Sequence, residues 1–136
     1  MAWYRFLLAD PRRKRLFTGL AVLWTIVILG LCFLPGNEIP DVRIPLADKW
    51  VHFIIFGCWA WLVLMARARA SRKTLIIAAI AAALFGWLVE VLQGQLSFLG
   101  RTQDNMDALA DAVGGVLGVA FFALMNRRSS VMGPQS

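Results

Sequence analysis

The chain has 136 residues, of which 60% are hydrophobic, and its mean hydropathy is +0.68. A soluble domain of this size could not bury that much apolar surface, so the composition favours a membrane protein. The formal net charge of +6 does not indicate nucleic acid as a partner, because the cations form short clusters beside apolar segments and no nucleic-acid motif accompanies them.

The amino-terminal third predicts an interfacial segment, a membrane span and a loop. Residues 1–15 combine aromatic and aliphatic side chains with a basic cluster at 12–15, which suits a short segment held at an anionic headgroup surface. Residues 16–34 are uncharged and long enough to cross a bilayer. Residues 35–47 contain three prolines, which end the span and predict a loop.

Three further apolar segments follow, at residues 50–66, about 74–92 and about 107–125. A short basic turn joins the first two of them, and a polar connection joins the last two. We therefore predict an all-α, polytopic membrane protein built as a bundle of four transmembrane helices. The predicted organisation is an interfacial segment at 1–15, one membrane domain at 16–126 and a cytoplasmic tail at 127–136.

The distribution of cations predicts the orientation of this bundle. Eleven of the 14 Lys and Arg residues lie in the amino-terminal segment, the basic turn and the tail. The remaining three are Arg43, Lys49 and Arg101. By the positive-inside rule, we expect a multi-pass protein of the inner (cytoplasmic) membrane with both termini in the cytoplasm.

The predicted topology brings titratable and amide side chains together at the outer ends of three spans. Ionisable residues within membrane segments are costly, so they indicate a functional site by default. The candidate ligand-binding residues are Asp48, His52, Glu90, Gln93, Arg101, Asp104, Asp107 and Asp111.

Spacing suggests partners within this set. Asp48 and His52 are four residues apart on one helix, so they can form a hydrogen bond. Glu90 and Gln93 are three residues apart and point the same way. Asp48 could instead cap the second span.

The fourth span begins with the motif RTQDNMDALADAVGGVLG at residues 101–118. Asp104, Asp107 and Asp111 share one helical face, and the glycines that follow allow a neighbouring helix to approach closely. Asp104 could also act as a helix cap. We expect the aspartates to hold Arg101, with an Asp111–Arg101 pair as one option; alternatively, Arg101 only anchors the chain at headgroups.

Three motifs together resemble the VanZ-like integral membrane proteins: DKxxHF at 48–53, ExxQ at 90–93, and RxxDxxD at 101–107 followed by GGxxG at 114–118. The resemblance covers residues 48–118. It implies a link to glycopeptide (teicoplanin) resistance and the cell envelope. The family commonly has Asn where this chain has Asp111, which adds a negative charge here.

Three functions remain open at this stage. The first is a polar site on the outer face that binds an envelope lipid headgroup or a glycopeptide-related ligand through Arg101, and so contributes to antibiotic resistance or envelope homeostasis. The second is a membrane enzyme acting on a lipid-linked envelope precursor, with His52 and Glu90 as acid and base. The third is an ion- or proton-coupled transporter. Membrane lipids are the expected partners. No cofactor is evident, although Glu90, Asp104 and Asp107 could hold a divalent cation.

Overall fold

The computed structural model describes residues 10–35, 46–67 and 70–131, with side chains as far as residue 126. These ranges contain four long helices and no strand, which confirms the all-α prediction. The helices are α2 (Pro11–Cys32), α3 (Ala47–Met65), α4 (Arg72–Gln95) and α5 (Asn105–Val131). A short 3₁₀ turn, η2 (Ser97–Leu99), joins α4 to α5.

All four helices are long and apolar enough to cross a membrane. Only 17% to 33% of each candidate span is buried inside the protein. Large apolar side chains such as Ile26, Ile80, Leu84 and Phe121 face outward, each more than half exposed. Exposing so large an apolar surface to water is unfavourable, whereas the lipid of a bilayer accommodates it. The chain is therefore a multi-pass membrane protein.

The first helix begins earlier than hydropathy alone predicts. Asp10 is its N-cap and accepts a hydrogen bond from the backbone N–H of Arg12 at 2.8 Å, while Pro11 occupies the first helical position. The basic cluster at 12–15 therefore belongs to the first turn of α2. Residues 1–9 of the predicted interfacial segment, and most of the predicted proline-rich loop, lie outside the described residues.

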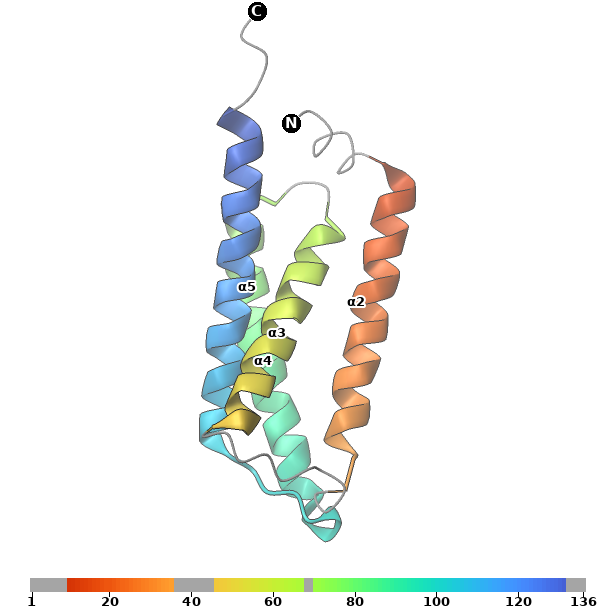
Figure 1. Ribbon diagram of the computed structural model, residues 1–136, viewed down its shortest axis with the longest axis vertical. Helices are drawn as coiled ribbons and strands as arrows, with labels where there is room; N and C mark the ends of the chain where they lie inside the picture. The colour runs from red at the N-terminus through yellow and green to blue at the C-terminus, as the bar shows by residue number, and fades with distance from the viewer. Residues whose placement is uncertain (1–9, 36–45, 68–69, 132–136) are drawn as a thin grey trace, which may run out of the picture.

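The helices alternate in direction, so the starts of α3 and α5 lie at the same end of the bundle as the end of α4 (Figure 1). We call this the site end. The opposite end contains the first turns of α2 and α4, with their cations, and we call it the basic end.

Glycines set the spacing between α3 and α5, which form the most extensive helix contact in the described bundle. A methyl group added at Gly114 would collide with the carbonyl of Phe53, and one added at Gly118 would collide with the carbonyl of Gly57. Gly115 lies against Ala82 of α4 in the same way. The prediction that these three α5 glycines allow close packing is confirmed.

Helix α2 stands to one side of the other three (Figure 1). It is joined to α3 by two indole hydrogen bonds: Trp24 donates to the carbonyl of Ile55 at 3.0 Å, and Trp59 donates to the hydroxyl of Thr25 at 2.9 Å. Below these bonds, toward the site end, a buried cluster completes the contact. Its members are Ile28, Cys32, Phe56 and Val89.

Candidate functional site

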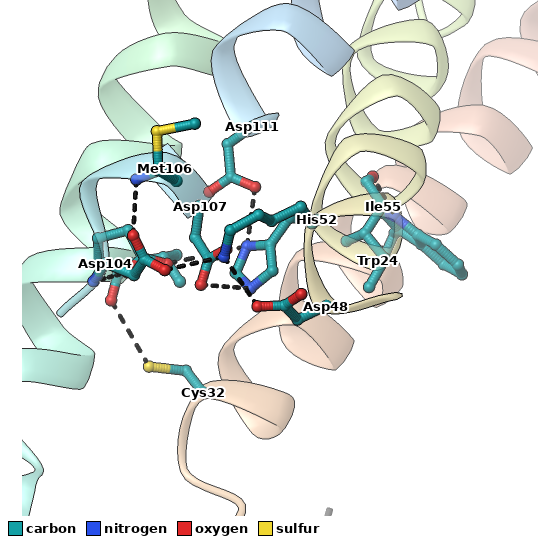
Figure 2. Close-up of polar contacts among 12 residues, drawn as sticks. Trp24, Cys32, Asp48, His52, Ile55, Asp104, Met106, Asp107 and Asp111 are labelled. Atoms are coloured by element: carbon teal, nitrogen blue, oxygen red, sulfur yellow. Dashed lines mark hydrogen bonds and ion pairs between the residues drawn. The ribbon is translucent and has the colours of Figure 1, made fainter. Parts of the chain in front are cut away.

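Lys49 lies at the centre of the site end, among three carboxylates. Its Nζ is 2.8 Å from Asp48 Oδ2, 2.8 Å from Asp104 Oδ2 and 2.8 Å from Asp107 Oδ1. Figure 2 shows these three aspartates gathered beside His52. Charge-assisted hydrogen bonds of this kind are stronger than neutral ones. One ammonium group therefore neutralises part of the acidic cluster and joins the start of α3 to the start of α5.

Asp104 has a second role as the N-cap of α5. Its Oδ1 accepts a hydrogen bond from the backbone N–H of Met106 at 2.8 Å, so the capping prediction is confirmed. The hydrogen bond from Lys49, followed by the one from Met106, holds the pKa of the Asp104 carboxyl below its usual value. The capping prediction for Asp48 is wrong, because Leu46 occupies the N-cap of α3, in a left-handed conformation and with no side-chain cap.

His52 joins α3 to both acidic helices. Its Nδ1 is 2.9 Å from Asp111 Oδ1 and 3.8 Å from Glu90 Oε1, and its Nε2 is 3.7 Å from Asp107 Oδ2. The predicted Asp48–His52 hydrogen bond is wrong, because Asp48 turns to Lys49 instead. The imidazole reaches across to α5 because the glycine contacts bring that helix close to α3.

Asp111 is fully buried beneath the histidine. Its Oδ1 meets His52, whereas its Oδ2 has no hydrogen-bond partner among the described residues and lies against Gly86 of α4. A methyl group at position 86 would collide with the Asp111 side chain, so Gly86 provides the space that this carboxyl group occupies. The predicted option of an Asp111–Arg101 pair is wrong, since the partner of Asp111 is His52.

Glu90 is also fully buried, and it fixes the connection between α4 and α5. Its Oε2 accepts a hydrogen bond from the backbone N–H of Asp104 at 3.0 Å. Gln93, in the amide orientation that satisfies both of its neighbours, donates to Glu90 Oε1 at 3.2 Å and accepts a hydrogen bond from Arg101 Nη2. The prediction that Glu90 and Gln93 point the same way is therefore confirmed.

Arg101 differs from its predicted role. The aspartates were expected to hold its guanidinium group, but they hold Lys49 instead, and Arg101 contacts Gln93. Lys49 is the main residue that sequence reasoning missed. A signal was available, because Lys49 precedes His52 by three residues and so shares its helical face.

The eight predicted residues, together with Lys49, form one connected set at the site end. Five carboxyl groups face two permanent cations and one histidine, so acidic groups outnumber basic ones in the set. Its inner members, Glu90 and Asp111, are fully buried. Its outer members are accessible: the side chain of Asp48 is 61% exposed and that of Asp104 is 41% exposed.

Among the described residues, two groups of three side chains have their ligand atoms within 4.8 Å of one another, close enough to share a metal ion. Asp48, Asp104 and Asp107 form one, but the Lys49 ammonium already contacts all three carboxylates. His52, Glu90 and Asp107 form the other, which offers one nitrogen and two oxygen ligands. The second group is the better candidate for a divalent cation. It differs from the predicted trio, since His52 replaces Asp104.

A family model described as VanZ/LLP1 matches residues 15–126 of the chain. The chain belongs to the VanZ/LLP1 family. The matched region of this VanZ/LLP1 protein includes every residue of the connected set and extends well beyond the motifs that carried the resemblance. No curated protein and no solved structure matches the chain significantly.

Proposed function

We propose that the connected polar set binds the headgroup of an envelope lipid or a glycopeptide-related ligand at the outer face of the cell membrane. Binding there would contribute to antibiotic resistance or envelope homeostasis. The observation that carries the proposal is the graded exposure of the set: accessible carboxyl groups at Asp48 and Asp104 lie above fully buried ones at Glu90 and Asp111. A set that served packing alone would have no need of accessible charges on a buried polar base.

The orientation follows from the cations. Those in the first turns of α2 and α4, with Arg67 after α3, lie at the basic end of the bundle. The positive-inside rule places this end in the cytoplasm, so the site end faces outward. A ligand of the outer leaflet or the cell envelope would then reach the set without crossing the membrane.

The side chains define the chemistry of this ligand. A guanidinium group such as that of Arg101 suits a phosphate or carboxylate group, which it can bind in a bidentate manner. The surplus carboxylates accept hydrogen bonds from hydroxyl and ammonium groups. We therefore expect a ligand that carries an anionic group beside hydroxyl or amino groups, as lipid-linked sugars and glycopeptides do.

Lipid extraction and mass spectrometry of the purified protein would test the proposal. The wild type should retain an envelope lipid that the Arg101→Ala variant loses. Arg72→Ala is the matched control, because it removes an exposed arginine at the opposite end of the bundle. Equal lipid content in all three proteins, together with unchanged glycopeptide susceptibility of cells carrying Arg101→Ala, would refute the proposed site.

One observation favours an enzyme as the second candidate. Nδ1 of His52 lies 2.9 Å from the buried Asp111, and in the tautomer that donates to this carboxylate Nε2 is free to take a proton. Nε2 is directed toward Asp107, at 3.7 Å from its Oδ2. Turnover of a lipid-linked envelope precursor by the wild type, lost in His52→Gln, would favour this function over simple binding.

The transporter alternative gains no support from the described residues. The charged side chains of the four spans lie at the two ends of the bundle, and none connects the site end to the basic end. A proton or ion path needs polar groups between the two.

A further inference from the structure

A groove separates α2 from α3 at the basic end, opposite the candidate site. It has a volume of about 650 Å³. One wall is formed by Lys14, Thr18, Val22 and Thr25, which recur along one side of α2 at helical spacing. The facing wall belongs to α3 and includes Trp59 and Val63, with Arg67 just beyond the helix end.

The length of this groove matches one leaflet of a bilayer. From Lys14 to Thr25 the helix advances eleven residues, which is about 16 Å at about 1.5 Å per residue. Half of a hydrocarbon core of about 30 Å is about 15 Å. The groove therefore extends from the membrane surface to about the midplane.

The threonine hydroxyl groups along the walls already form hydrogen bonds within the protein. The Thr18 hydroxyl donates to the Lys14 carbonyl at 2.8 Å, and the Thr25 hydroxyl donates to the Ala21 carbonyl at 2.8 Å. Thr25 also accepts from the indole of Trp59 at 2.9 Å. The remainder of the groove is apolar, so an apolar chain fits it better than a polar ligand does.

The mouth of the groove has the opposite character. Lys14 and Arg67 are both exposed, and they come from different helices on either side of the opening. Arg12 and Arg15 in the same helical turn are exposed as well and add to the positive potential. Cations at the membrane surface above an apolar groove complement an anionic headgroup with its acyl chain below.

We propose that the groove between α2 and α3 binds an anionic phospholipid, with its phosphate between Lys14 and Arg67 and one acyl chain along Val22, Val63 and Trp59. This lipid site is independent of the connected polar set and lies in the other leaflet. The bound lipid would fill the space between α2 and the rest of the bundle, so it would support the helix that has the fewest contacts with its neighbours.

Native mass spectrometry of the full-length protein in detergent, with phosphatidylglycerol or phosphatidylcholine as the added probe, tests the charge requirement. The wild type should retain phosphatidylglycerol in preference to phosphatidylcholine. The Lys14→Gln/Arg67→Gln double variant should bind phosphatidylglycerol about twenty-five-fold more weakly, since each surface cation contributes a factor of about five. Arg72→Gln/Lys73→Gln removes the same charge from the same end, outside the groove, and should keep the wild-type affinity.

A second variant tests the place of the acyl chain. Val63→Trp fills the groove without removing charge, so it should abolish phosphatidylglycerol retention. Ile54→Trp, on an outward-facing part of α3, should leave retention unchanged. Equal retention of the two lipids by the wild type, an unchanged affinity in the Lys14/Arg67 double variant, or full retention by Val63→Trp would each overturn the proposal.

Discussion

Replacing Lys49 by Met should destabilise the protein, because it leaves three carboxylates without their shared cation. The side chains of Asp48 and Asp104 are 61% and 41% exposed, so water screens their ion pairs with Lys49. Losing these two ion pairs should therefore change the free energy of unfolding little. Asp107 is only 12% exposed, and removing its charged hydrogen-bond partner should cost about 2 kcal/mol of unfolding free energy. Most of the effect therefore depends on one of the three ion pairs.

The assay is reversible unfolding in a denaturing detergent, followed by circular dichroism, for Lys49→Met, Asp107→Asn and the double variant. The double variant should be less destabilised than the sum of the two single variants, because the uncompensated carboxylate is gone. Lys49→Arg keeps the charge and serves as the control. Strict additivity of the two single effects would refute the view that Lys49 acts mainly through Asp107.

Three further changes test the rest of the site. Gly86→Ala should lower the unfolding free energy by about 1–3 kcal/mol in the same assay, because its methyl group collides with Asp111, and adding Asp111→Ala should restore much of the loss. Glu90→Gln and Arg101→Ala should each abolish glycopeptide resistance while leaving the protein in the membrane fraction. Resistance equal to that of the wild type in both variants would contradict the proposed site. Asp104 has a lowered pKa in the folded protein, so its contribution to stability is present above about pH 4 and is lost as the pH falls below that value. An acid titration of Asp104→Asn should therefore show a shallower loss of stability than the wild type, and identical titrations would exclude this contribution.

Hydropathy predicted the architecture well, because a bilayer imposes a minimum length on each helix and leaves few alternatives. The four predicted spans correspond to α2, α3, α4 and α5. The helix ends were less predictable. Cations lower the mean hydropathy of a sequence window, so hydropathy places residues 12–15 outside the first helix. Asp10 and Pro11 nevertheless form a recognisable helix start.

Most residues of the candidate site could be predicted from the sequence, with Lys49 as the exception, but their pairings could not. Charge cost and topology were enough to bring Glu90 and the α5 aspartates to one end. Spacing within a helix then suggested Asp48 as the partner of His52, whereas the actual partner, Asp111, belongs to another helix. The pairing of His52 with Asp111 depends on the distance between α3 and α5, and the glycines set that distance only when the helices pack.

The lysine at the centre of the site has a consequence for membrane insertion. Helices of a membrane protein enter the bilayer in the order of their synthesis, and the partners of Lys49 on and before α5 follow it by 55 and 58 residues. Of the three carboxylates that contact Lys49, Asp48 alone precedes it in the chain and is present from the start. The last helix therefore completes the site, and a chain released before α5 would expose Lys49 without two of its three carboxylate partners to membrane quality control.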